Sequence, residues 1–356
     1  MAWDHAATGV QAALDLDLPG KVDTGAKPAP AMGFSATNWS GYVAAPIEAL
    51  AASAPEYEVY VPRPGGEDLV LYRGRRVAVK SADVDQLRRR GIDRVYLPER
   101  DLAAFQQQLR DELLASDSSA SPVQRAAAAM FLARLTLQDA FNSPKCERLV
   151  QASQELAEQI TTHLADESLR VPELLGLVEH DYQTYTHACN VSVYSLLLAR
   201  RLGMDDSAEL EQIALGGLLH DVGKRHVPAH LLNKRGPLTD EEWEVVCRHP
   251  ADGYRELAHR DDVTWGTLMM VYQHHERNDG SGYPAAVLED EVHAWAKICA
   301  VADVFDALTS DRPYRKPLST RDVCNTMRRQ AQAWFDAEIV ECLCAEMERE
   351  EACHGT

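Results

Sequence analysis

The sequence predicts a mainly α-helical protein, in which an all-helical domain follows a small α/β domain. Three observations support this prediction. Short alternating runs of apolar and polar residues, typical of strands, occur between residues 56 and 98. Apolar residues recur at spacings of three and four in residues 123–141 and 145–164, as in amphipathic helices, and no convincing strand follows Val171. A chain of 356 residues also exceeds the usual size of one domain.

Residues 1–54 are rich in alanine, proline, glycine and serine and show no sustained hydrophobic period. Segments of this composition bury too little apolar surface to offset the entropy that ordering costs. We therefore expect residues 1–54 to form a disordered arm that packs, if at all, around Trp39 or Tyr42.

Residues 55–115 are predicted to form the small α/β domain. Strands are expected in EYEVYV, DLVLYR and RRVAV, with a turn at PGGED between the first two. A helix over SADVDQLRRRG is expected to end at Gly91, followed by a strand in RVYLP and a second helix from Glu99. This domain contains no residues with the spacing of a metal or phosphate site, so we expect it to be regulatory.

The serine-rich stretch SDSSASP, residues 116–122, is predicted to be a linker, and Pro122 is expected to open the first helix of the second domain. The helical domain would then span residues 123–356, with its core at about 145–350. Its first two helices carry apolar residues that suit packing against the core, against a second copy in a homodimer, or against a signalling partner.

The charge and cysteine content restrict the partners and the compartment. Lysine and arginine number 36 against 55 aspartate and glutamate residues, a net charge of −19, which argues against binding to duplex nucleic acid or to an anionic membrane. The 8 cysteines form no CxxC pair, as expected for thiols in a reducing compartment. No apolar stretch approaches the roughly 18 residues of a membrane span, and no signal peptide is recognisable, so we expect a cytoplasmic protein.

Histidine and aspartate side chains occur in several separate segments of the helical domain. Imidazole nitrogen and carboxylate oxygen are ligands that suit Fe, Mn, Ni and Zn, and a bridging carboxylate allows two such ions to lie a few ångströms apart. The sequence therefore predicts a multinuclear metal site. Its candidate ligands are His187, His220, Asp221, His249, His274, His275 and Asp303.

These segments resemble the HD-GYP family, a subgroup of HD-domain metallohydrolases that cleaves cyclic di-GMP. The resemblance covers roughly residues 145–350 and comprises HDVGK, HLLNKRGPLTDEEWE, RHPADGY, HHERNDGSGYP, VADVFDALTSDRPYRKPLS and FDAEIVE, in that order. A single HD dipeptide has little value, as His180–Asp181 illustrates, but several ordered segments are specific. The loop after HDVGK departs from the family pattern, because Arg225–His226 replaces a commoner apolar–glycine pair.

The resemblance implies that the candidate ligands hold two ions and that Asp221 bridges them and is essential for catalysis. The other ligands would divide into two sets: His187, His220 and Asp303 for one ion, and His249, His274 and His275 for the other.

Gln183 bears on the number of ions. Some family members carry an acidic residue one helical turn before the first histidine, where a third ion can bind. This chain has Gln183 there, and a neutral amide is a poor ligand for a cationic cluster, so we expect two divalent transition-metal ions. Iron is the first expectation and manganese, nickel and zinc are alternatives, since mixed histidine and carboxylate sites accept all four.

The resemblance also indicates substrate contacts. Lys224, about one helical turn after the HD pair, can reach a phosphate group and is a candidate catalytic residue. Tyr283, in the turn DGSGYP, is a candidate contact for a base, and Asp181 is a candidate acceptor for a guanine edge. Arg312 and Arg315 could bind phosphate or stack on guanine.

The predicted activity is hydrolysis of cyclic di-GMP to linear pGpG and, in a further step, to GMP. Two cations that share a solvent molecule lower its pKa from about 15.7 toward 7, so a bridging hydroxide is expected to attack phosphorus. No residue is identified as the general acid. Two alternatives stay open: a broader HD phosphohydrolase that acts on another cyclic nucleotide or dinucleotide, and a catalytically silent receptor of cyclic di-GMP. The full ligand set argues against the receptor.

Overall fold

The computed structural model describes residues 39, 41–50, 56–63, 68–114, 122–141, 145–164, 184–232, 234, 236–310 and 318–354. The described residues fall into two compact units. Of the described residues, the N-terminal unit contains those up to 136 and 162–164, and the helical unit contains residues 137–161 and those from 184 onward. The predicted fold class, a helical domain preceded by a small α/β domain, is confirmed.

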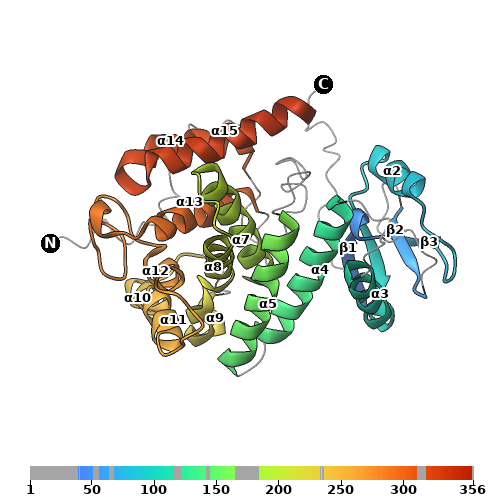
Figure 1. Ribbon diagram of the computed structural model, residues 1–356, viewed down its shortest axis with the longest axis horizontal. Helices are drawn as coiled ribbons and strands as arrows, with labels where there is room; N and C mark the ends of the chain where they lie inside the picture. The colour runs from blue at the N-terminus through green and yellow to red at the C-terminus, as the bar shows by residue number, and fades with distance from the viewer. Residues whose placement is uncertain are drawn as a thin grey trace. The chain divides into compact units, whose positions relative to one another are not determined.

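The N-terminal unit is built on a four-stranded antiparallel sheet with the strand order β1-β4-β2-β3 (Figure 1). Its strands and helices are β1 (Tyr42–Pro46), β2 (Val59–Pro62), β3 (Leu69–Arg73), α2 (Ser81–Arg89), β4 (Arg94–Pro98), α3 (Leu102–Leu114) and the first part of α4 (Pro122–Phe141). Short 3-10 turns, Ile47–Ala49 and Glu99–Asp101, follow β1 and β4.

Local sequence explains the ends of α2. The Asp83 carboxylate accepts a hydrogen bond from the Lys80 backbone N–H at 2.9 Å, which caps the first turn. Gly91 follows the helix with a φ of +71°, a left-handed conformation that commonly ends helices and favours glycine. These two signals place α2 where the sequence predicts it.

Residues 42–46 correct the expectation of a disordered arm up to residue 54. They form β1, which pairs along β4 from Tyr42 opposite Pro98 to Pro46 opposite Arg94. The partner strand, β4, lies about fifty residues later in the sequence. This long-range pairing therefore cannot be recognised from the residues next to β1. Residues 1–38 of the expected arm lie outside the described part of the chain.

The stretch RRVAV is not a strand, contrary to expectation. Val77 N–H donates to the Gly74 carbonyl at 3.2 Å, which closes a turn, and Arg76 has a φ of +63°. Both features are incompatible with an extended run. The tip that contains PGGED lies partly outside the described residues.

The N-terminal unit extends past the expected boundary at 116–122. Its core includes Ala128, Phe131, Leu132 and Leu135 of α4, all buried. The Phe131 ring contacts Phe105 of α3 with a centroid separation of 5.3 Å. The first part of α4 therefore belongs with the sheet, while residues 115–121 lie outside the described residues.

Deleting residues 1–120 is expected to expose this apolar face of α4, because the deletion removes the sheet and α3 but keeps Phe131. The truncated protein should bind the dye ANS and aggregate, whereas a deletion of residues 1–136 should not, since it also removes the exposed apolar residues. A 1–120 deletion that stays monomeric without binding ANS would show that α4 does not depend on the sheet.

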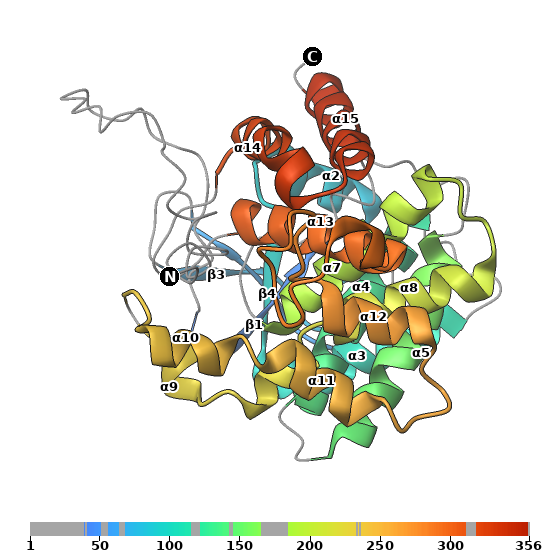
Figure 2. The same cartoon turned by 90° about the vertical axis from the view of Figure 1, so that its left-hand side faces the viewer.

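In the helical unit, α7, α8, α12 and α13 pack against one another, and α11 packs against α12 (Figure 2). None of its described residues forms a strand, as predicted. The helices are α5 (Cys146–Leu164), α7 (Thr184–Arg201), α8 (Ser207–Leu219), α9 (Ala229–Leu232), α10 (Asp240–Val246), α11 (His249–Leu257), α12 (Trp265–Gln273), α13 (Ala294–Thr309), α14 (Thr320–Trp334) and α15 (Ala337–His354).

Two glycines allow the close contacts that bring these helices together. A Cβ atom on Gly217 of α8 would lie 2.5 Å from the Ser192 Cα of α7. A Cβ atom on Gly223, in the 3-10 turn Val222–His226, would lie 1.9 Å from the His249 carbonyl oxygen. Since no side chain fits at either position, the segment that carries His220 and Asp221 lies directly against α7 and α11.

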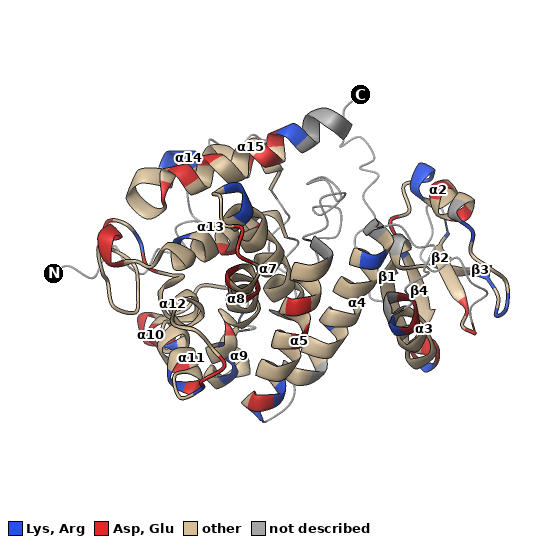
Figure 3. Cartoon of the chain, viewed as in Figure 1, with Lys and Arg blue, Asp and Glu red and all other residues tan. Residues whose placement is uncertain are grey.

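Both acidic and basic residues lie on α14 and α15 (Figure 3). Arg328 Nε lies 2.8 Å from Glu341 Oε2, and Arg328 Nη1 lies 2.5 Å from Glu348 Oε1. These exposed pairs join the two helices, although ion pairs at such positions contribute little stability. No helix among the described residues is both long and apolar enough to cross a membrane.

Candidate metal centre

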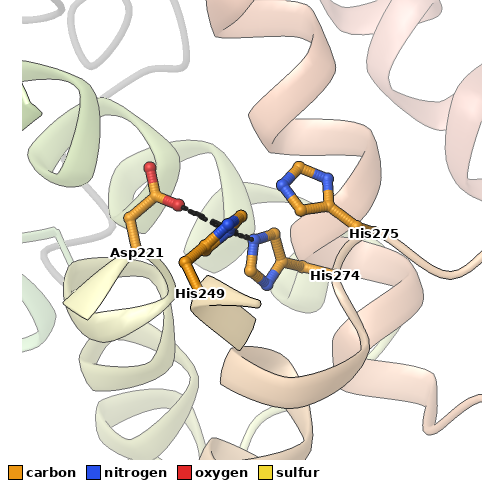
Figure 4. A group of neighbouring side chains, drawn as sticks. All are labelled: Asp221, His249, His274 and His275. Atoms are coloured by element: carbon orange, nitrogen blue, oxygen red, sulfur yellow. Dashed lines mark hydrogen bonds and ion pairs between the residues drawn. The ribbon is translucent and has the colours of Figure 1, made fainter. Parts of the chain in front are cut away.

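The predicted ligands, which come from five helices or their ends, meet in the interior of the helical unit. All are buried. His187 lies on α7, His220 and Asp221 follow α8, His249 begins α11, His274 and His275 follow α12, and Asp303 lies on α13. They form two groups, in each of which the ligating atoms lie within 4.8 Å of one another: Asp221, His249, His274 and His275 (Figure 4), and His187, His220 and Asp303.

Asp221 lies between the two groups. Its Oδ1 is 3.2 Å from His249 Nε2 and 3.8 Å from His274 Nε2. Its Oδ2 is 3.4 Å from His220 Nε2 and 3.9 Å from His187 Nε2. One carboxylate thus directs each oxygen toward a different group, which is the arrangement that a bridging ligand requires.

Asp303 makes a second, longer link between the groups. Its Oδ1 lies 3.0 Å from His187 Nε2, and its Oδ2 lies 3.9 Å from His275 Nδ1. The shorter distance associates Asp303 with the His187 group.

Three of the histidines are oriented by backbone carbonyl groups three or four residues earlier in the chain. Because a carbonyl oxygen can only accept, each imidazole Nδ1 carries the proton and each Nε2 is left as an electron-pair donor. The acceptors are the carbonyl oxygens of Gly217 for His220 at 2.8 Å, Val246 for His249 at 2.8 Å, and Met270 and Val271 for His274, both at 3.0 Å.

His187 is oriented by a carboxylate that the sequence analysis did not single out. Its Nδ1 lies 2.7 Å from Asp306 Oδ2, and Asn190 Nδ2 donates to Asp306 Oδ1 at 2.7 Å. All three side chains are buried. The spacing of these residues in the sequence could have indicated their role. Asn190 lies one helical turn after His187, and Asp306 lies one helical turn after Asp303, so each shares a helix face with a ligand.

Replacing Asp306 with asparagine should weaken metal binding, because the amide cannot hold the His187 ring and its tautomer as a carboxylate does. The expected loss of affinity is about ten- to a hundredfold. A competition titration with a chromogenic chelator measures it, with the exposed Asp290→Asn as matched control. Unchanged affinity in Asp306→Asn would contradict the orienting role.

The buried polar atoms fit divalent cations. His220 Nε2, Asp221 Oδ1 and His275 Nδ1 have no hydrogen-bond partner although they are buried. Leaving such atoms unsatisfied is costly, so nearly all buried polar groups in proteins find a partner. Each of these three atoms belongs to one of the two ligand groups, and imidazole nitrogen with carboxylate oxygen is a donor set for divalent transition metals. The cluster is therefore suited to bind divalent metal.

Burial keeps His274 and His275 neutral. Burial, followed by the neighbouring His220 and His249, lowers the pKa of His274 to about 3. Burial and the adjacent His274 also hold the pKa of His275 well below its usual range. A neutral imidazole is the form that binds a metal ion.

The two carboxylates of the cluster are kept ionised. Burial alone would raise the pKa of Asp221, but the Lys224 ammonium and His220 outweigh it and hold that pKa well below its usual value. Burial alone would likewise raise the pKa of Asp303, but the contact with His187 outweighs burial and holds that pKa well below its usual value. Both carboxylates are thus in the ligating form at neutral pH.

Lys224 reaches the cluster from its exposed side. Its Nζ lies 2.5 Å from Asp221 Oδ2, and 21% of its side chain is exposed. The partly exposed Lys224 side chain therefore ends in an ion pair with the buried Asp221 carboxylate.

Tyr283 covers a candidate ligand. Its ring centroid lies 4.7 Å from that of His275, with an angle of 33° between the planes. The loop is held from behind by the buried Glu276, whose Oε1 accepts hydrogen bonds from Ala285 N–H at 2.7 Å and Ala286 N–H at 3.1 Å. The role of Glu276 could not be predicted from the sequence, because a single acidic residue after HH has no recognisable spacing.

Four residues considered in the sequence analysis cannot be placed. Asp181, Gln183, Arg312 and Arg315 lie outside the described residues. Their contacts with substrate, and the expectation of two ions that rests on Gln183, stay predictions.

Comparisons with known proteins agree with this geometry. Residues 176–339 match the family model for the HD domain, a range that contains every candidate ligand. The chain is 37% identical over 188 residues to cyclic di-GMP phosphodiesterase PA4108 of Pseudomonas aeruginosa, which covers 52% of this chain and 44% of the relative. It is 36% identical over 150 residues to 3'3'-cGAMP-specific phosphodiesterase 1 of Vibrio cholerae, covering 41% and 34%. The matches span less than half the length of these relatives.

A solved structure shares the fold. Bd1817, an HDG"Y"P protein from Bdellovibrio bacteriovorus, superposes with a TM-score of 0.60 at 17% sequence identity, covering 86% of this chain and 99% of that one. Identity at this level supports the fold and carries no information on substrate.

Proposed function

We propose that this chain, a member of the HD-GYP family of HD-domain proteins, is a metal-dependent phosphodiesterase that hydrolyses cyclic di-GMP. The observation that carries the proposal is the position of Asp221, whose two oxygens face two separate groups of buried ligands. Binuclear sites of this type act on phosphate esters. The likeness to a relative named a cyclic di-GMP phosphodiesterase supports the choice of substrate.

Two divalent ions, with iron as the first candidate and manganese, nickel or zinc as alternatives, would supply Lewis acidity and lower the pKa of water when bound. His187, His220 and Asp303 would hold one ion, His249, His274 and His275 the other, and Asp221 would bridge them. In the reaction, a water oxygen forms a bond to phosphorus and the bond to the 3′ oxygen breaks, with a proton passing to that oxygen. The product is linear pGpG, and a second hydrolysis would give GMP.

The residues around the cluster bind and orient. Lys224 would pair with a phosphate oxygen, since its ammonium contacts Asp221 and its side chain is partly exposed. Tyr283, which lies against His275, is proposed to contact a base, and Asp306 keeps His187 in the orientation that a ligand needs. Asp181, Arg312 and Arg315 are proposed as further substrate contacts.

Replacing Lys224 with methionine should weaken the turnover of cyclic di-GMP and leave metal content near that of the parent, because a protonated amine cannot ligate a cation. Losing one charge-assisted contact lowers kcat/KM by about ten- to a hundredfold. Steady-state kinetics and metal analysis of the same sample test this. Wild-type kinetics would remove Lys224 from the substrate site, and loss of metal would show that it acts through Asp221.

Hydrolysis of 3'3'-cGAMP should be measured beside that of cyclic di-GMP, because one relative of similar sequence identity is named as specific for 3'3'-cGAMP. We expect cyclic di-GMP to be cleaved with the higher kcat/KM, and both activities to disappear after chelation and to return when metal is restored. Binding of cyclic di-GMP without cleavage by the metal-loaded protein would favour a silent receptor. Preference for 3'3'-cGAMP would favour the broader phosphohydrolase.

The N-terminal unit is proposed to be regulatory. Both candidate ligand groups found among the described residues lie in the helical unit.

A further inference from the structure

We infer that Trp243, on α10, stacks against one purine of the substrate and so helps to select a dinucleotide. The inference rests on the proposed function and adds to it a residue that determines specificity. It starts from a row of aromatic rings beside the metal cluster: His275, then Tyr283, then Trp243.

The first observation is the geometry of that row. Tyr283 lies 4.7 Å from His275 between ring centroids, and Trp243 lies 6.1 Å from Tyr283 with the planes at 80°. Rings that meet nearly at right angles form a corner. At least one face of the indole is therefore left uncovered by Tyr283, and the Trp243 side chain is only half-buried.

The second observation is that α10 holds Trp243 in place. The Thr239 hydroxyl accepts from Glu242 N–H at 3.3 Å, and the Glu242 carboxylate accepts from Thr239 N–H at 2.7 Å, a capping box that fixes the first turn. The same Glu242 carboxylate pairs with Lys234. One turn after Trp243, the Cys247 N–H donates to the Trp243 carbonyl at 2.8 Å. The tryptophan thus lies on a helix turn whose backbone is fixed on both sides, and its ring meets Tyr283 of the neighbouring loop.

The third observation is that Tyr283 is fixed independently of Trp243. Its N–H donates to the His275 carbonyl at 3.2 Å, and Glu276 holds the following residues Ala285 and Ala286. The corner between the two rings is therefore formed before substrate binds, which lowers the entropy that binding costs.

The chemistry of a cyclic dinucleotide fits this corner. Its two purines extend on either side of the phosphodiester ring, so when one phosphate lies at the metal cluster a base can extend past Tyr283. Purine faces stack on aromatic side chains, and alanine substitution of such a side chain typically weakens binding by between about five- and a hundredfold. A phosphodiester without purines gains nothing from Trp243, which separates stacking from a structural role.

The test compares Trp243→Ala, Trp243→Phe and the parent, each as the full metal-loaded chain. We expect Trp243→Ala to lower kcat/KM for cyclic di-GMP by about five- to a hundredfold, mainly through KM, and to change hydrolysis of the base-free analogue, cyclic di(1-deoxyribose phosphate), which has no aromatic ring, by less than about twofold. Trp243→Phe should retain most of the parent activity. Calorimetric titration with cyclic di-GMP should show the same loss of affinity in Trp243→Ala.

Trp265→Ala is the matched control, because Trp265 is 62% exposed and lies at the end of α12 remote from His274. The Trp265→Ala variant should hydrolyse both substrates with the kinetics of the parent. Equal loss on both substrates in Trp243→Ala would overturn the inference in favour of a structural role, as would unchanged affinity for cyclic di-GMP. If the parent cleaves neither substrate, the proposed function fails, whereas the calorimetric comparison still decides whether Trp243 contacts the nucleotide.

Discussion

Replacing Asp221 with asparagine will abolish the hydrolysis of cyclic di-GMP and lower the metal content of the protein. The substitution keeps the shape of the side chain but removes the charge that each oxygen offers to a separate group of histidines. Removing one preorganised charged group from an active site commonly lowers kcat by a hundred- to a thousandfold, and here we expect a loss at or beyond about a thousandfold. Kinetics and inductively coupled plasma analysis measure both effects.

Asp206→Asn is the matched control for this variant. Asp206 caps the start of α8, where it accepts from Glu209 N–H at 2.8 Å, and asparagine caps a helix equally well. The control should match the parent in activity, metal content and thermal stability. An Asp221→Asn protein that is fully metallated and active would show that Asp221 does not bridge the ions.

Substituting one ligand on each side of Asp221 should remove the two ions separately. His187→Gln and His249→Gln are each expected to retain about one ion of two. Each should also lose more than about a hundredfold in kcat, because a binuclear site uses both ions to stabilise the charge that develops on the phosphate oxygens. His187 lies in the group with Asp303, and His249 in the group with His274. Metal analysis of both variants, with the exposed His259→Gln as control, distinguishes the groups.

Two outcomes would contradict this division of ligands. Loss of both ions in either variant would mean that the groups form one cooperative site. Retention of both ions would mean that the substituted histidine is not a ligand.

The helical fold and the candidate ligands could be predicted because both follow local patterns. The ligands lie in short segments such as HDVGK and HHERNDGSGYP, and their order along the chain is distinctive. Their convergence depends on helix packing, which the sequence indicates only through small residues such as Gly217 and Gly223. The distances that divide the ligands between two groups required the structure.

Non-local contacts account for what the sequence analysis missed. β1 is a strand because β4 pairs with it, and the first part of α4 belongs to the N-terminal unit because Phe131 packs on Phe105. Asp306 and Glu276 act through partners on other segments, namely His187 and the loop after Tyr283. In each case the informative contact joins residues that local spacing does not relate.

The most direct test of the account is a single measurement on protein purified without oxygen: metal content, and the products formed from cyclic di-GMP, followed across a titration with chelator. We expect about two transition-metal ions per chain, of which iron is the most abundant, and pGpG formation that falls as metal is removed. Cleavage that persists in metal-free protein, or metal-loaded protein that leaves cyclic di-GMP intact, would contradict it.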